Sequence, residues 1–170
     1  WYSEFNGNVY FDDSKFNEKA KVEFIDSSFR GYTSFKGTQF SDGILYLGQD
    51  SFFLDTLCLS KSNIKGIDDY VRWSNIHNLE YNIKAYNIFF DNYKKWRLFD
   101  DYNDCYYRFR IESMKSMPIS AWYLEYLQWI LYGFGLKPER PVTWSITIIP
   151  LAGAFFYRKN GISKSIPSNT

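Results

Sequence analysis

The stretch SEFNGNVYFDDSKFNEKAKVEFIDSSFRGYTSFKGTQFSD, residues 3–42, decides the fold, because phenylalanine returns in it every five to eight residues. A strand repeats every two residues and a helix every 3.6, so neither keeps these rings on one side of the chain. Each has a small or β-branched residue two positions earlier, and most are followed closely by glycine or aspartate. The chain must turn within nearly every unit, which is typical of a coiled β-solenoid. Its expected core rings are Phe5, Phe11, Phe16, Phe24, Phe29, Phe35 and Phe40.

Two regions follow from the local patterns. Short apolar runs separated by glycines continue to about residue 66, so residues 1–66 are predicted to form the solenoid. Within residues 67–117, aromatic and aliphatic residues fall at helical spacings, which predicts an αα-hairpin with Asp100 and Asp101 capping its second helix. Such a hairpin would cover a coil end that otherwise presents unpaired strand edges.

The last third of the chain is rich in aromatic and apolar residues. Residues 118–141 contain Trp and Tyr interrupted by Glu125 and Gln128, then glycines and prolines, which favours an interfacial helix and a hinge. Residues 142–157 carry no charge, and basic residues flank them. Sixteen residues are short of the roughly 20 that a span needs, but snorkelling flanks make a transmembrane helix feasible.

The alternative for residues 142–157 is a helix buried in a protein core. Residues 158–170 form a polar tail, whose connector-like composition suggests that the chain continues. The evenly distributed basic residues leave the membrane orientation open. The residues expected at the membrane interfaces are Trp122, Trp129, Trp144, Tyr157, Arg158 and Lys159.

Composition limits the possible functions. The net charge of +1 gives no electrostatic reason to expect a nucleic-acid partner. Cys58, Cys105 and a single histidine, His77, exclude a Cys/His zinc site; the two cysteines are either one disulfide or two half-buried thiols. No cofactor or metal is expected.

Candidate catalytic groups are better explained as structure. The pairs Asp12-Asp13, Asp68-Asp69 and Asp100-Asp101 suit turns or helix caps. No relay partner stands near them, no phosphate-binding loop is present, and no nucleophile pairs with His77. Tyr132-Gly133-Phe134-Gly135 lacks the entry residues of a potassium-channel filter and is interpreted as a hinge. We therefore expect no enzymatic activity and no catalytic residue.

The whole chain resembles pentapeptide-repeat membrane proteins, notably those of archaea. The resemblance is carried by the Ser/Thr/Val-x-Phe-x-Gly/Asp units of residues 3–42, by the Asp-Asp-Tyr-Asn-Asp-Cys-Tyr-Tyr-Arg stretch of residues 100–108, and by Tyr-Gly-Phe-Gly-Leu-Lys-Pro at residues 132–138. Some relatives continue into a two-helix ion-channel pore, so the resemblance implies channel function for a longer parent protein. This sequence has no second membrane helix and no filter.

The sequence thus predicts an α+β protein: a short pentapeptide-type β-solenoid, an αα-hairpin and a C-terminal membrane helix. The expected function is a membrane-anchored, non-enzymatic structural or accessory subunit, single-pass in the cell membrane. The expected partners are membrane lipid and other subunits or a second copy, with no nucleic acid. The alternatives are the regulatory front end of an ion channel and a soluble aromatic-surface module that binds carbohydrate.

Overall fold

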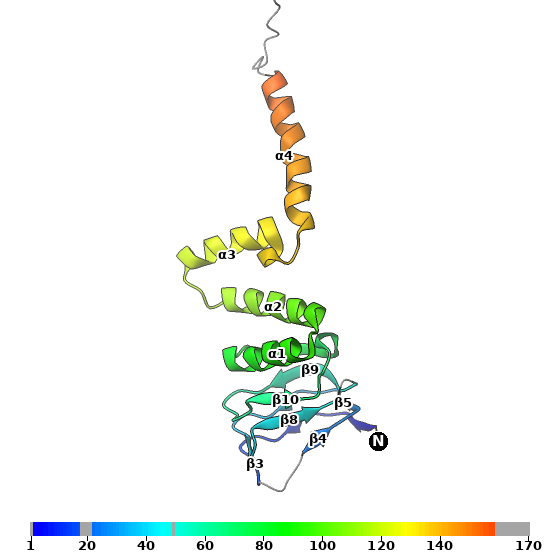
Figure 1. Cartoon of the computed structure of the whole chain (residues 1–170). Coiled ribbons are helices and arrows are strands. Elements are labelled where there is room, and N and C mark those ends of the chain that lie inside the picture. Colours follow the sequence, from blue (N-terminus) through cyan, green and yellow to red (C-terminus); the bar gives the residue numbers. More distant parts are fainter. Residues whose placement is uncertain (1, 18–21, 49, 159–170) are drawn as a thin grey trace, which may run out of the picture. The chain divides into compact units, whose positions relative to one another are not determined.

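A computed structural model describes residues 2–17, 22–48 and 50–158. It divides into two compact units, Trp1–Ser116 and Met117–Thr170 (Figure 1). Lys159, predicted at a membrane interface, and the rest of the tail after residue 158 lie outside the described residues.

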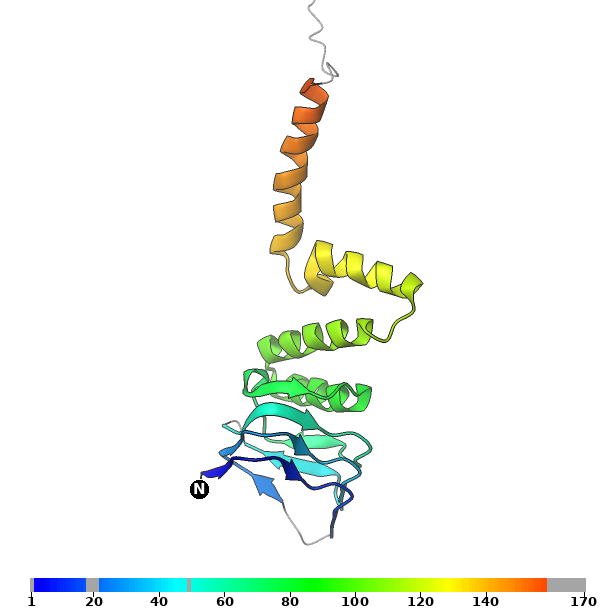
Figure 2. The same ribbon diagram turned by 180° about the vertical axis from the view of Figure 1, so that it is seen from behind.

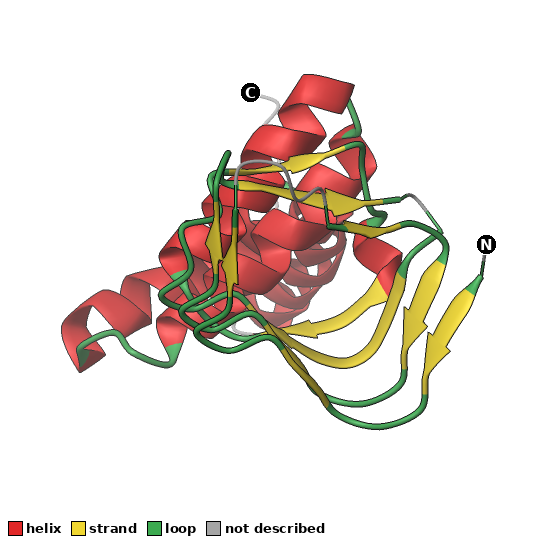
Figure 3. Ribbon diagram, turned by 90° about the horizontal axis from the view of Figure 1, so that it is seen from below, coloured by secondary structure: helices red, strands yellow, loops and turns green. Residues whose placement is uncertain are grey.

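The first unit begins with a β-solenoid, as predicted (Figures 1 and 3). The first coil holds β1 (Ser3–Phe5), β2 (Val9–Tyr10), β3 (Lys15–Phe16) and β4 (Glu23–Phe24), and the second holds β5 (Ser27–Phe29), β6 (Thr33–Ser34), β7 (Gln39–Phe40) and β8 (Ile44–Leu47). The third continues with β9 (Phe52–Cys58) and β10 (Gly66–Asp68); after a 3₁₀ turn, η1 (Trp73–Asn75), comes β11 (Ile76–Leu79). The strands therefore continue past residue 66, the boundary expected from the sequence.

All the strand pairs among the described residues are parallel, and their register explains the uneven phenylalanine spacing. Ser3 pairs with Ser27, an offset of 24 residues, and β2–β6 and β3–β7 share this offset. The steps of six, five, eight and five residues that lead from Phe5 to Phe29 also add up to 24. Each step is one side of a four-sided coil, so the rings come back into line once per coil.

The rings stack along the coil. Phe29 lies between Phe5 and Phe53, with ring centroids 4.7 and 4.9 Å away. Two further stacked pairs follow the same offset: Phe11 on Phe35 and Phe16 on Phe40. The second-coil rings and Phe24 of the first coil are buried, whereas the other first-coil rings, Phe5, Phe11 and Phe16, are partly buried. Each fully buried ring contributes roughly 1.5–3 kcal/mol through the apolar area removed from water.

An αα-hairpin follows the solenoid (Figure 2). It consists of α1 (Ile83–Trp96), capped by the Asn82 side chain, and α2 (Phe99–Met114). The buried face of α1 is tied to the chain around β10: the Asn92 amide donates to the carbonyls of Ile67 and Asp69, and the Tyr93 hydroxyl donates to the carbonyl of Val71. The hairpin therefore shares one core with the coil.

The second unit contains α3 (Ile119–Tyr132), the short turn η2 (Gly133–Gly135) and α4 (Glu139–Arg158). None of the residues in α3 or α4 is buried. Both helices therefore combine an apolar composition with exposed side chains.

The predicted membrane helix is wrong. Within residues 2–17, 22–48 and 50–158, no helix combines the length and the apolar character needed to cross a membrane. The helix found, α4, begins three residues before residue 142 and takes in the charged Glu139 and Arg140, while hydroxyl residues dilute its apolar side chains. The uncharged run of residues 142–157 covers about 24 Å at 1.5 Å per residue, less than a hydrocarbon layer of about 30 Å.

Candidate functional site

The corner between α3 and α4 is formed by Gly133 and is held by hydrogen bonds from the side chains of Arg140 and Trp144. Gly133 ends α3 with φ +55°, and an added Cβ would lie 2.5 Å from Cγ of Lys137, so a larger residue would be strained there. Arg140 donates from its guanidinium to the carbonyl of Trp129. The indole N–H of Trp144 donates to the carbonyl of Ile130 at 3.1 Å. Two carbonyls in the last turn of α3 are thereby satisfied by α4.

A row of aromatic rings runs along α3 to this corner. Trp122 stacks on Tyr126 at 4.8 Å, and Tyr126 lies 5.7 Å from Trp129. The guanidinium of Arg140 sits over the Trp129 ring, 5.4 Å from its centroid. This is a cation–π contact, which holds the cation on an aromatic surface.

The hydroxyl side chains of α4 form hydrogen bonds with the backbone of the same helix. The hydroxyls of Thr143, Ser145 and Thr147 each donate to the carbonyl four residues earlier, at 2.8–2.9 Å. This local bonding leaves fewer polar groups for the surroundings to satisfy. Within its uncharged stretch, α4 presents a predominantly apolar surface.

That apolar surface covers opposite sides of α4. At 100° per residue, Val142, Ile146, Ile149 and Phe156 fall on one side, while Trp144, Ile148, Leu151 and Phe155 fall on the other. Every one of these side chains is exposed, and Ile149 reaches 70%. On α3, the exposed apolar residues are Ile119, Tyr123, Leu124, Leu127, Leu131 and Tyr132.

The residues predicted at membrane interfaces are only partly brought together. Trp122 and Trp129 share the row along α3, and Trp144 joins them at the corner. Tyr157 and Arg158 lie at the far end of α4, where Tyr157 is 81% exposed. Sequence reasoning missed Tyr126, although its position four residues after Trp122 was a usable signal. It treated Arg140 only as a flanking charge.

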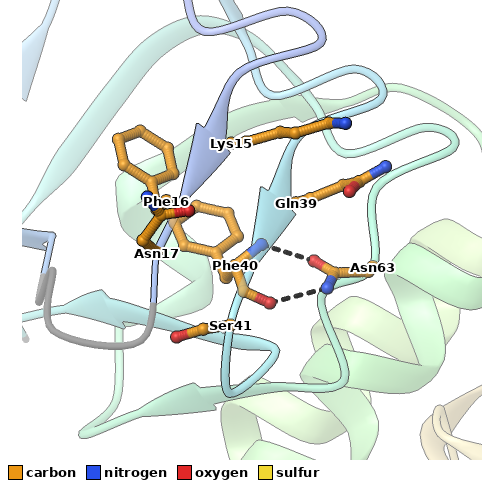
Figure 4. A pocket seen from close by; sticks show the side chains of 7 residues that line it. All are labelled: Lys15, Phe16, Asn17, Gln39, Phe40, Ser41 and Asn63. Carbon is orange, nitrogen blue, oxygen red and sulfur yellow. Dashed lines mark hydrogen bonds between the residues drawn. The ribbon is translucent and has the colours of Figure 1, made fainter.

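A second candidate is a surface groove on the solenoid, about 830 Å³ in volume, along β3 and β7 (Figure 4). Lys15 and Gln39 extend side by side into it, with Asn17 and Ser41 along its other margin. Asn63 instead turns to the backbone of Phe40: its Oδ1 accepts from the amide at 2.7 Å, and its Nδ2 donates to the carbonyl at 2.6 Å. Among the described residues, the third coil adds no strand beside β7. The Asn63 side chain instead makes the two hydrogen bonds to Phe40 that a neighbouring strand would make.

The other candidate residues from the sequence make contacts that stabilise the fold. Asp12 accepts from the hydroxyl of Ser34 and from the amide of Lys36, and Asp101 accepts from the amide of Trp73 at 2.6 Å. Asp101 therefore ties α2 to η1, whereas no side chain caps the start of α2. Cys58 and Cys105 are buried free thiols.

No family model, curated protein or solved structure matches the chain.

Proposed function

We propose that the protein is a non-enzymatic repeat protein that attaches to the surface of a lipid bilayer through α3 and α4, where its capped solenoid serves as a structural or accessory subunit of a membrane complex. The observation that carries the proposal is the exposed apolar surface on opposite sides of α4, combined with hydroxyls that bond to the helix's own carbonyls.

The distribution of apolar side chains favours lipid over a protein groove. A helix that lies in a protein groove hides one stripe of side chains and leaves polar residues on its other side. The opposite faces of α4 are both apolar, and α3 combines a high aromatic content with very few charges. Lipid around a helix that lies at the bilayer boundary can contact both of these faces, whereas a groove contacts one.

The charges fit the headgroup level of a bilayer. Lys137 and Arg140 lie at one end of α4 and Arg158 at the other, so a helix at the boundary of headgroups and acyl chains keeps every cation near phosphate. Indole rings prefer the same layer, because they combine an apolar ring with a polar N–H.

Vesicle flotation tests the attachment. The protein is expected to float with phosphatidylcholine vesicles, and Ile148→Arg is expected to weaken binding by roughly ten- to a hundredfold, since burying one large aliphatic side chain is worth about 1.5–3 kcal/mol. Ile148 is 56% exposed, so the change does not disturb a core. Ser145→Ala is the matched control and should bind as the unchanged protein does. Recovery of the unchanged protein at the bottom of the gradient would reject the proposal.

The pentapeptide-repeat resemblance supports the scaffold part of this proposal. Four-sided coils with phenylalanine stacks agree with that resemblance, although the offset of 24 residues averages six residues a side rather than five. Membership of that family is part of the proposal. The channel and carbohydrate-binding alternatives stay predictions.

A further inference from the structure

The first coil of the solenoid has strand edges that are paired on one side only. Among the described strands, β1, β2, β3 and β4 each pair with a second-coil strand and with no other. At the opposite end of the solenoid, α1 packs on the chain around β10 (Figure 2). One end of the coil is therefore covered by a helix, and the other presents open edges that can pair with further strands.

The backbone of β2 shows which groups are open. The amides of Val9 and Phe11 donate to the carbonyls of Tyr32 and Ser34, both at 2.8 Å. Alternate residues of a strand direct their backbone groups to opposite sides. Tyr10 therefore directs its N–H and C=O away from the second coil, toward the open end.

The first coil has the sequence of an interior coil rather than that of a terminal one. Terminal repeats of a solenoid need a polar outer face for solubility. The first coil instead carries Phe5, Phe11 and Phe16, and each of these partly buried rings has one face stacked on a second-coil ring. Another coil on this end would bury the remaining apolar surface of the three rings.

Two equivalent glycines indicate that this end suits close stacking. Gly7 and Gly31 are 24 residues apart, which is the offset of one coil. An added Cβ at Gly31 would lie 2.7 Å from the carbonyl of Gly7, so the neighbouring coil requires glycine there. At Gly7, no described atom lies within 4 Å of an added Cβ. The first coil thus has the small residue that a stacked coil requires, at a place where the described chain provides no such coil.

We propose that this end of the solenoid binds the same end of a second copy, so that two first coils stack head to head across a twofold axis. A partner must offer strand edges along four sides of a coil of the same perimeter, and a second copy has these by identity. Across a twofold axis its strands run antiparallel to those of the first copy and pair with their open edges. Because α1 covers the other end of each solenoid, the assembly closes at two copies. The inference goes beyond bilayer attachment and names the surface through which the subunit meets a partner.

Gly7→Val tests the stacking. In a single chain the added side chain enters open space, whereas a coil stacked on this end would collide with it, as the first coil would with a side chain at Gly31. The unchanged protein should show a monomer–dimer equilibrium, and Gly7→Val should weaken the dimer by roughly ten- to a hundredfold, since overpacking a close contact is unfavourable. Gly66→Val, in β10 of the third coil, is the matched control, because an added Cβ there also meets no described atom within 4 Å. Its dimer should be as strong as that of the unchanged protein.

Sedimentation equilibrium over a range of protein concentrations measures the dissociation constant of the dimer. Non-ionic detergent, with micelles in excess over protein, keeps the apolar surfaces of α3 and α4 from associating. Ile148→Arg, the variant expected to weaken vesicle binding, should dimerise as the unchanged protein does. A monomer at every concentration would overturn the proposal. A dimer that resists Gly7→Val, or that Ile148→Arg dissociates, would also overturn it.

Amide hydrogen exchange of the unchanged protein reads the coil end directly. The Tyr10 amide should exchange more slowly at high than at low protein concentration, because the partner's strand accepts its hydrogen bond. The Lys65 amide, which donates to the Gly43 carbonyl in the third coil, should exchange equally at both. Equal exchange of the Tyr10 amide at both concentrations would overturn the edge pairing. Gly7→Val should still float with vesicles, so loss of the dimer and loss of bilayer attachment are distinguished.

Discussion

Phe29 and Phe53 lie one above the other in consecutive coils, with ring centroids 4.9 Å apart and planes inclined by 1°. Phe5 continues the column on the other side of Phe29. The contact joins residues 24 positions apart, so it depends on closing a whole coil.

Neighbouring phenylalanines in β9 test this column. Phe53 is buried, whereas Phe52, the preceding residue, points the other way and is 37% exposed. Phe53→Ala is expected to lower the free energy of unfolding by about 3–5 kcal/mol, because it leaves a cavity in the stack. Phe52→Ala should cost about 1.5 kcal/mol or less, in proportion to the smaller area it buries. Urea titration of both variants measures the difference, and similar losses would contradict the stacked core.

Asn63 gives a second prediction, because its amide replaces a strand beside Phe40. Asn63→Asp keeps the acceptor but cannot donate to the Phe40 carbonyl when ionised, so we expect a loss of roughly 1–3 kcal/mol at neutral pH. Protonation of the new carboxyl restores a donor, so the deficit relative to the unchanged protein should shrink below about pH 4. Gln39→Ala, at an exposed position of β7, is the control and should stay within about 0.5 kcal/mol. A deficit independent of pH would contradict the hydrogen-bonding role.

The sequence predicted the elements that local patterns encode. The phenylalanine spacing indicated turns in every unit, and the helical spacing in residues 67–117 indicated a hairpin. The length of a coil was harder to predict, because the steps between rings are unequal and the offset itself changes from 24 residues in β1–β5 to 23 in β4–β8 and 22 in β8–β10. The strand-like role of Asn63 could not be predicted, since it depends on a partner 23 residues away.

The candidate site was only partly predictable for the same reason. Trp129 and Trp144 were identified by composition. That they lie close together depends on the αL turn at Gly133 and on hydrogen bonds between α3 and α4. The transmembrane prediction failed because it counted uncharged residues and underweighted the hydroxyls and the charged first turn of α4.

The buried thiol of Cys105 predicts how stability changes with pH. Burial, with a smaller effect of the Asp101 carboxylate, raises the pKa of Cys105 above its usual value. The folded state therefore keeps this proton at a pH where the unfolded chain loses it. Stability should be unaffected by Cys105 below about pH 8.5 and fall above it by about 1.4 kcal/mol per pH unit. Burial also raises the pKa values of Tyr86 and Tyr93, so the decline should steepen above about pH 10.

Urea titrations across the alkaline range measure this decline. Cys105→Ala removes the titrating thiol and should flatten the segment between about pH 8.5 and 10, although the variant starts from a lower stability. An unchanged slope in that segment would show that another group is responsible.

Two glycines of the second unit give the last prediction. Gly133→Ala places a side chain at φ +55° and 2.5 Å from the stem of Lys137, which should open the corner at a cost of about 1–2 kcal/mol. Gly153, inside α4, has no atom within 4 Å of an added Cβ, so Gly153→Ala should instead strengthen the helix by roughly 0.5–1 kcal/mol.

Hydrogen exchange distinguishes the two variants. The amides of Leu136 and Lys137 donate to the carbonyls of Gly133 and Tyr132, so both should exchange about five- to thirtyfold faster in Gly133→Ala and unchanged in Gly153→Ala. Unchanged exchange at both amides in Gly133→Ala would show that the corner does not depend on this glycine.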